Sequence, residues 1–176
     1  MWKYLTHPNI LPLLGVTIAP FQLISTWMPS GDLPEYIKNN PNADRLGLVG
    51  VPPVVFASNA YSSYQLSDVA RGLCYLHSRN VIHGDLKGVC DCCVSRFNIV
   101  LTPRQLNILM DSSNSARIAD FGLATVTQNL DSMRSTTCQR GHTVRWTAPE
   151  LLSEGTYSKE TDMFSFAMVM IEVRDG

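Results

Sequence analysis

Four short motifs in this sequence carry side chains that could take part in chemistry. In chain order they are His83-Gly84-Asp85-Leu86-Lys87, Asn107-Ile108-Leu109, Asp120-Phe121-Gly122 and Ala148-Pro149-Glu150. Their carboxylate, amide and ammonium groups are of the types that transfer protons and bind hard cations. A single Asp-Phe-Gly is weak evidence, because an isolated aspartate is more often a turn or helix-cap residue. The four motifs together, in this order, form a much more specific pattern.

The ordered set resembles the signature motifs of the protein kinase family. His7-Pro8-Asn9-Ile10, residues 141–146 and Asp162 also match similar residues of kinases, so the resemblance covers nearly the whole chain. The chain is similar to serine/threonine kinases of the tyrosine-kinase-like group, of a fungal type. The resemblance implies that the intact protein transfers the γ-phosphate of ATP to a serine or threonine of a protein substrate, with ATP and Mg²⁺ as cofactors.

The resemblance implies a catalytic role for four residues. Asp85 would accept the proton of the acceptor hydroxyl and orient its oxygen, and Lys87 would place a positive charge on the transferred phosphoryl group. Asn107 and Asp120 would hold magnesium through their oxygen atoms. A lysine at position 87 is similar to the serine/threonine class, since tyrosine kinases usually differ there.

The same resemblance implies nucleotide-binding and structural residues. Ser25 stands at the gatekeeper position, and the hinge that binds adenine would follow it. The expected nucleotide-binding residues are Ser25, Thr26, Met28, Asp32 and Leu109. The expected structural or regulatory residues are Leu13, His83, Phe121, Gly122, Thr143, Glu150 and Asp162. Leu13, His83 and Phe121 would belong to a regulatory hydrophobic stack, and Thr143 would brace the catalytic aspartate.

The spacing between two motifs departs from the kinase pattern. The family has four residues between the catalytic aspartate and the asparagine, whereas Asn107 follows Asp85 by 22 positions. Removing residues 89–105, a segment of seventeen that begins with valine and ends with glutamine, restores the family spacing. Residues 49–65 form a second segment with the same length and the same end residues. This segment places Pro52-Pro53 inside an apolar helix pattern that its removal makes continuous.

We interpret both segments as insertions, and specifically as translated introns. Valine codons begin with GT and one glutamine codon is CAG, which match the usual boundaries of eukaryotic introns. Seventeen codons is also a common size for fungal introns. The alternative is a pair of natural kinase inserts, since loops accept insertions at a modest entropic cost. An insert within the catalytic loop is harder to accommodate, which favours the intron interpretation.

Apolar patterns predict the elements that must position these motifs. Residues 10–18 and 21–28 read as two strands, 33–39 as a short helix and 81–82 as a buried strand. A spacing of three and four residues places one helix face at Leu66, Val69, Ala70, Leu73 and Leu76. Residues 158–162 cap a last helix that is apolar on most sides.

The predicted fold class is α+β, in which the remnant of a β-rich small lobe joins a mostly helical large lobe. We assign residues 1–26 to the end of the small lobe, 27–33 to the hinge and 34–176 to the large lobe up to its central apolar helix. The sequence holds no glycine-rich loop and no strand with the ATP-anchoring lysine. We therefore expect a kinase domain that is incomplete at both ends and inactive by itself. The alternative is a catalytically dead, pseudokinase-like binding module, which the substitution of Gly84 for the family's arginine favours.

The composition excludes several other classes. Lys and Arg number 14 against 15 Asp and Glu, so the chain carries no global field that would attract nucleic acid. No apolar run is long enough to span a membrane, and we expect a cytoplasmic protein. Five cysteines are an odd number, and Cys90-Asp91-Cys92-Cys93 has no second Cys or His pair at the spacing of a zinc site. We therefore expect neither a disulfide framework nor a structural metal.

Overall fold

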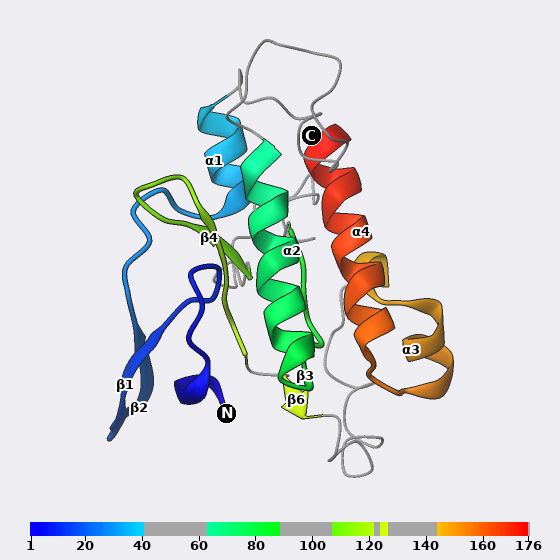
Figure 1. The fold of residues 1–176 in the computed structure, drawn as a ribbon, viewed down its shortest axis with the longest axis horizontal. Helices are drawn as coiled ribbons and strands as arrows, with labels where there is room; N and C mark the ends of the chain where they lie inside the picture. Colours follow the sequence, from blue (N-terminus) through cyan, green and yellow to red (C-terminus); the bar gives the residue numbers. More distant parts are fainter. Residues whose placement is uncertain (41–62, 89–106, 122–123, 127–143, 176) are drawn as a thin grey trace.

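The computed structural model describes residues 1–40, 63–88, 107–121, 124–126 and 144–175 (Figure 1). The β-strands in these ranges are β1 (Leu13–Ile18), β2 (Phe21–Ser25), β3 (Val81–Ile82), β4 (Ile108–Met110), β5 (Ala116–Ile118) and β6 (Thr125–Val126). The α-helices are α1 (Leu33–Asn39), α2 (Ser63–Ser78), α3 (Pro149–Glu154) and α4 (Lys159–Asp175). Two short 3₁₀ helices are η1 (Trp2–Tyr4) and η5 (Val144–Trp146). The short paired strands and the helices confirm the α+β class.

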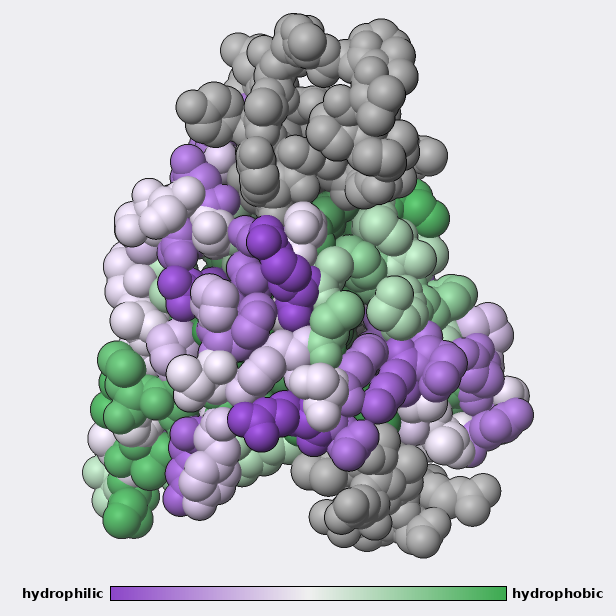
Figure 2. All heavy atoms as spheres, in the orientation of Figure 1, coloured by the Kyte–Doolittle hydropathy of each residue, from purple (hydrophilic) through white to green (hydrophobic). Residues whose placement is uncertain are grey.

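Strands β1 and β2 form an antiparallel hairpin that projects from the side of the molecule (Figure 1). Val16 pairs with Leu23 and Ile18 with Phe21, so these four side chains share one face of the hairpin. All four are at least half exposed, and Figure 2 shows the resulting apolar surface in green at the lower left. The expected strands were each too long, because residues before Leu13 and after Ser25 leave the hairpin to pack against the rest of the chain.

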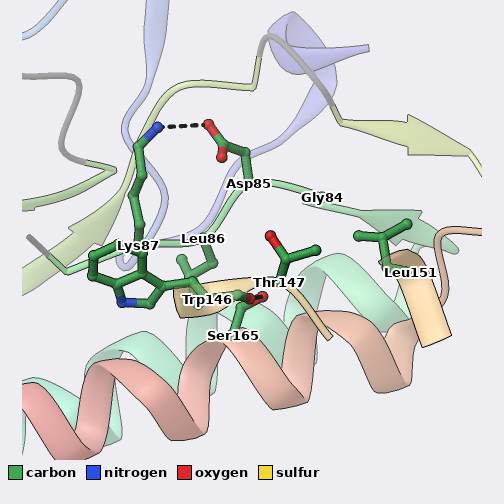
Figure 3. Close-up of a pocket in the computed structure, with 8 residues that line it drawn as sticks. All are labelled: Gly84, Asp85, Leu86, Lys87, Trp146, Thr147, Leu151 and Ser165. Atoms are coloured by element: carbon green, nitrogen blue, oxygen red, sulfur yellow. Dashed lines mark hydrogen bonds and ion pairs between the residues drawn. The ribbon is translucent and has the colours of Figure 1, made fainter. Parts of the chain in front are cut away.

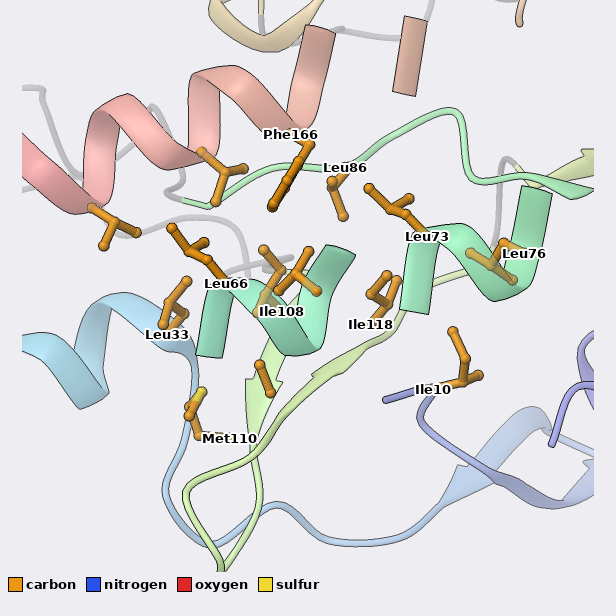
Figure 4. Packing of buried hydrophobic residues seen from close by; sticks show 14 of the residues in the cluster. Ile10, Leu33, Leu66, Leu73, Leu76, Leu86, Ile108, Met110, Ile118 and Phe166 are labelled. Carbon is orange, nitrogen blue, oxygen red and sulfur yellow. The ribbon is translucent and has the colours of Figure 1, made fainter. Parts of the chain in front are cut away.

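Helices α2 and α4 lie side by side and bury the main core between them and the β4–β5 hairpin (Figures 1 and 4). The predicted face of α2 is confirmed, with Leu66, Val69, Leu73 and Leu76 at most 2% exposed. Helix α2 begins at Ser63, so it includes the last three residues of the first predicted insertion. The other residues of both insertions lie outside the part of the chain that the structure describes.

The β4–β5 hairpin was not predicted, and it positions two of the motifs. Its turn is closed by Asp111, whose Oδ1 accepts hydrogen bonds from the backbone N–H groups of Ser113 (2.8 Å) and Ser115 (3.0 Å). Arg117 donates to Oδ2 of the same carboxylate at 3.0 Å. Burial alone would raise the pKa of Asp111, but these hydrogen bonds and the Arg117 charge outweigh it and lower that pKa. The asparagine motif therefore leads into the strand before this turn, and the Asp-Phe-Gly motif follows the strand after it.

Helix α4 starts at a cap within residues 158–162, as the sequence predicted, and the structure shows that this cap is reciprocal. The backbone N–H of Thr161 donates to Ser158 Oγ (3.2 Å), and the backbone N–H of Ser158 donates to Thr161 Oγ1 (3.1 Å). Phe166 and Val169 on this helix are buried, while Met163 is 50% exposed. Among the described residues, no helix is both long enough and apolar enough to cross a membrane.

Candidate active site

The segment from His83 to Lys87 is held in place by a buried carboxylate on α4. Asp162, which is 1% exposed, accepts hydrogen bonds from the backbone N–H groups of His83 and Gly84, each at 2.9 Å. The same carboxylate lies 2.8 Å from Nε2 of His77 on α2. Gly84 has a φ of +78°, a left-handed conformation that a glycine adopts without strain. Asp162 was expected to be structural, and its contacts give it the specific task of shaping this segment.

Asp85 and Lys87 of this segment converge with Asn107. The Lys87 ammonium donates to Asp85 Oδ2 at 2.9 Å, as the dashed line in Figure 3 marks. The amide nitrogen of Asn107 donates to the backbone carbonyl of Asp85 and lies 3.4 Å from Asp85 Oδ2. Three residues that the sequence motifs singled out are thus joined, although 22 positions separate Asp85 from Asn107.

The amide of Asn107 presents an oxygen suited to a hard cation. Its side chain is fully buried, and its nitrogen is committed to Asp85. Its Oδ1 has no hydrogen-bond partner within the described ranges. A buried oxygen without a donor is costly unless a ligand satisfies it, and amide oxygens are among the ligands that Mg²⁺ and Ca²⁺ accept. This residue therefore fits the metal role that the kinase resemblance implies.

Asp120 comes directly after a residue, Ala119, that is hydrogen-bonded to the backbone of Asn107. The N–H of Ala119 donates to the Asn107 carbonyl at 2.8 Å, so the two motifs are adjacent at the end of the β4–β5 pair. Asp120 itself has a φ of +57°, which is uncommon for a residue with a side chain and is often found at functional sites. No three His, Cys, Asp or Glu side chains gather into a metal cluster in the described part of the chain. That result does not conflict with Mg²⁺, which usually binds one or two carboxylates together with water and phosphate.

An aromatic stack supports the Asp-Phe-Gly motif. The rings of His83 and Phe121 meet edge to face with centroids 5.5 Å apart, and the centroid of the Trp2 ring lies 5.3 Å from that of Phe121. His83 Nε2 is 2.9 Å from the carbonyl oxygen of Ala119. The predicted stacking of His83 with Phe121 is therefore present. Leu13 begins β1, and its membership of the stack stays a prediction.

Trp2 is a member of the stack that the sequence analysis missed. Its indole N–H donates to the carbonyl of Leu11 at 2.6 Å, which anchors the ring against the chain that leads into β1. The only signal in the sequence is a large aromatic residue in an otherwise unassigned N-terminal segment. A stacking partner so far from Phe121 in sequence cannot be found from local patterns.

Of the predicted nucleotide-binding residues, Met28 and Leu109 share one apolar cluster, and the other three lie outside it. Met28 is buried with Leu11 and Ala119, and Leu109 packs against the same cluster, so two expected adenine contacts are brought together. Ser25 ends β2, and Thr26 follows it in the chain before Met28. Asp32 serves as the N-cap of α1, where its Oδ1 accepts the N–H of Glu35 at 2.8 Å. A capping role was not expected for Asp32, and its contact with ribose stays a prediction.

A small, shallow hollow lies beside the segment of Asp85 (Figure 3). The catalytic segment forms one wall, and residues from η5, α3 and α4 form the other. Its lining residues are Gly84, Asp85, Leu86, Lys87, Trp146, Thr147, Leu151 and Ser165. The last four were not predicted, because they meet the catalytic segment only through tertiary packing.

Three other expected positions remain to be placed. Glu150 is exposed in the first turn of α3. Gly122 and Thr143 lie outside the described residues, as do the three clustered cysteines.

The chain matches a family profile described as protein tyrosine and serine/threonine kinase over residues 1–176. It therefore belongs to the protein kinase family. A probable serine/threonine-protein kinase of Dictyostelium discoideum is 31% identical over 172 residues, which cover 98% of this chain and 11% of that protein. The serine/threonine-protein kinase VIK of Arabidopsis thaliana is 32% identical over 178 residues, covering 98% of this chain and 34% of that kinase.

Tyrosine kinases are also among the relatives. Protein-tyrosine kinase 6 of Mus musculus is 33% identical over 175 residues, which cover 97% of this chain and 31% of that kinase. The chain spans between about a tenth and a third of the length of these curated relatives.

Proposed function

We propose that the protein carrying this chain transfers the γ-phosphate of Mg²⁺-bound ATP to serine or threonine hydroxyls of protein substrates. The observation that carries the proposal is the convergence of Asp85, Lys87 and Asn107 across 22 positions of sequence. These residue types match the phosphoryl-transfer machinery of the kinase family. We further propose a cytoplasmic location, with ATP and a protein as partners and no nucleic acid.

In this proposal Asp85 is the group that receives the substrate hydroxyl. Its side chain is 21% exposed, and hydrogen bonds from Lys87 and Asn107 fix its orientation. A fixed carboxylate can align the acceptor oxygen for in-line attack and take its proton. Lys87 can then place its charge on the transferred group, because its ammonium already lies beside the acceptor position.

Asn107 and Asp120 would hold the magnesium ion. The buried and unpartnered Oδ1 of Asn107 supports this assignment. A bound magnesium ion would supply positive charge that neutralises the phosphate oxygens. Met28 and Leu109 would contact the adenine ring from the apolar cluster that they share, with Ser25, Thr26 and Asp32 completing the nucleotide site.

The assignment to serine and threonine rests on Lys87, since a lysine two positions after the catalytic aspartate is typical of that class. Relatives of both acceptor classes occur, so the test must distinguish them.

The test is phosphate transfer by the full-length protein from radiolabelled ATP to a generic basic protein, followed by phosphoamino-acid analysis. We expect Mg²⁺-dependent labelling of serine and threonine. Removing one electrostatic or positioning group typically costs about 10²–10³ in rate, so Asp85→Asn and Asp120→Asn should each lose at least that much. Glu154→Gln, at an exposed position on α3, is the matched control and should keep full activity. A folded protein that binds Mg²⁺–ATP tightly without transferring phosphate would instead indicate the binding-module alternative.

A further inference from the structure

His7 closes a turn near the N-terminus with both its backbone and its ring. Its carbonyl accepts the backbone N–H of Ile10 at 3.1 Å, and Nδ1 of its ring accepts the backbone N–H of Asn9, also at 3.1 Å. An imidazole nitrogen that accepts a hydrogen bond carries no proton, so the neutral ring holds its proton on Nε2. Protonation must therefore add the second proton at Nδ1. There it would face the N–H of Asn9, and this hydrogen bond would be lost.

The ring of His7 lies against helix α2. It stacks on the ring of Tyr75 with centroids 4.8 Å apart, and the Tyr75 hydroxyl accepts the N–H of Thr6 at 2.9 Å. Burial lowers the pKa of His7 from its ordinary value of 6.5, and the Arg71 charge lowers it further, while Asp68 opposes both effects. The folded chain therefore favours the neutral ring. The charged groups on the neighbouring elements are Asp68, Arg71 and Arg79 on α2 and Lys3 on η1.

Asn9 leads from this turn into a short stretch that pairs with β5. Its carbonyl accepts the N–H of Ile118 at 2.9 Å, and the N–H of Leu11 donates to the Ile118 carbonyl at 2.8 Å. Asn9 is buried, and its side-chain nitrogen donates to the carbonyl of Ala116 at 3.1 Å. A Cβ atom built onto Gly72 of α2 would lie 2.8 Å from the Asn9 carbonyl oxygen, so this glycine permits the close approach. The position of Asn9 therefore decides how the stretch pairs with β5.

Leu11, at the end of this stretch, connects it to the expected nucleotide site. It is 4% exposed and buried with Met28 and Ala119, in the cluster that Leu109 packs against. Its carbonyl also accepts the indole N–H of Trp2 at 2.6 Å. A movement of the stretch away from β5 would therefore disturb the apolar cluster that we assign to the adenine ring.

We propose that His7 is a pH-sensitive switch, in which protonation of its ring releases Asn9, loosens the pairing of residues 9–11 with β5 and weakens ATP binding. The switch itself rests on the contacts above, whereas its effect on ATP rests on the proposed function. The stability that the neutral ring contributes is complete above the ordinary histidine pKa of 6.5. It is lost as pH falls from that value through the lower pKa of folded His7.

Two substitutions separate the hydrogen bond from the titration. His7→Asn keeps an acceptor, because an asparagine side-chain oxygen can accept the N–H two residues ahead in an Asx turn, and its amide does not titrate. His7→Phe keeps an aromatic ring to stack on Tyr75 and removes the acceptor at every pH. The contact of Asn9 with the side chain at position 7 should therefore be independent of pH in both variants, present in the first and absent in the second.

Hydrogen exchange of the full-length protein, followed by mass spectrometry, measures the switch without reference to activity. We compare exchange at about pH 7.5 and about pH 5.5, a range in which histidine titrates, after correction for the intrinsic rate at each pH. In wild type, exchange of the peptides that contain residues 9–11 and β5 should rise about fivefold in acid, as expected for the loss of one hydrogen bond. It should not depend on pH in His7→Asn, and it should be fast at both pH values in His7→Phe.

Two results of this measurement would overturn the proposal. An equal rise in wild type and His7→Asn would assign the effect to other groups, and no rise in wild type would exclude a switch at this position. If a variant does not fold, a pH series on wild type decides. The rise must then have its midpoint below pH 6.5, and a higher midpoint refutes the role of His7.

ATP binding shows whether the switch reaches the nucleotide site. The Kd for Mg²⁺–ATP at the same two pH values should rise about fivefold in acid in wild type and stay within about twofold in His7→Asn. Protonation of ATP itself affects both proteins equally, so equal rises in the two would refute the coupling to ATP. If wild type binds no ATP at either pH, the proposed function fails, while the exchange measurement still decides the role of His7.

Discussion

The amide nitrogen of Asn107 donates a hydrogen bond to the backbone carbonyl of Asp85, although the intervening segment is far longer than kinases use. The two residues are therefore arranged as if the segment between them were absent. Gly88 and Asn107 are the described residues that flank the gap. This arrangement bears directly on the intron interpretation of residues 49–65 and 89–105.

We expect deletion of residues 49–65 and 89–105 to stabilise the chain. Closing a loop costs about (3/2)RT ln n, so shortening the connection from Asp85 to Asn107 should contribute roughly 1 kcal/mol. Urea unfolding of the deleted and original chains measures the difference. Sequencing the transcript is the independent check, because spliced introns would be absent from it. A deleted chain that no longer folds would show that the segments are natural parts of the domain.

Residues 1–176 alone should phosphorylate protein at no useful rate. The glycine-rich loop and the anchoring lysine that cradle the phosphates in kinases have no counterpart in this sequence. Each such electrostatic group is worth about 10²–10³ in rate. The measurement is transfer from labelled ATP by the purified chain, and robust activity abolished by Asp85→Asn would contradict the expectation.

Asp162→Ala should destabilise the fold strongly. The change leaves the backbone N–H groups of His83 and Gly84 without their acceptor and removes the contact with His77. Breaking a buried charged network of this kind costs about 3 kcal/mol or more. Denaturant unfolding provides the value, with Glu154→Ala at an exposed position of α3 as the control that should change little. A loss no larger than the control's would mean that Asp162 does not organise the catalytic segment.

The Asp111 turn should make stability depend on pH in the acid range. Because the pKa of Asp111 is lowered from its ordinary value of 3.8, its contribution is complete above that pH and is lost as pH falls through the lower folded-state pKa. We expect Asp111→Asn to lose about 1 kcal/mol at neutral pH. The difference in free energy of unfolding between the wild-type protein and the variant should become smaller below pH 3.8. Unfolding curves at several pH values test this, and a constant gap would exclude the ionised carboxylate as its cause.

Helices with a clear apolar periodicity could be predicted from the sequence, and α1 has the predicted bounds Leu33–Asn39. The β4–β5 hairpin could not be predicted, because its strands have three residues each. That length is too short to show the alternation of apolar and polar residues that indicates a strand. Its turn signal was present in Asp111 and the serines that follow, where a side chain accepts backbone N–H groups. The residues of the turn therefore carried the only local signal for this hairpin.

The catalytic motifs could be predicted because their residue types and order are specific. Their supporting contacts could not be, since Trp2 reaches Phe121 and Glu172 reaches Trp146 only after the chain has folded. Asp32 illustrates the opposite difficulty, because one carboxylate can match a family position and also cap a helix.

The exposed face of the β1–β2 hairpin has a consequence for the life of this chain in a cell. No Lys, Arg, Asp or Glu occurs between Lys3 and Asp32. These strands therefore have no such charged side chain to oppose pairing with another chain at their edges. An apolar, uncharged strand edge is the kind of surface that chaperones retain and that quality-control proteases remove. We expect this turnover to limit the steady-state abundance of residues 1–176. Charged substitutions at Val16 and Leu23 should increase that abundance.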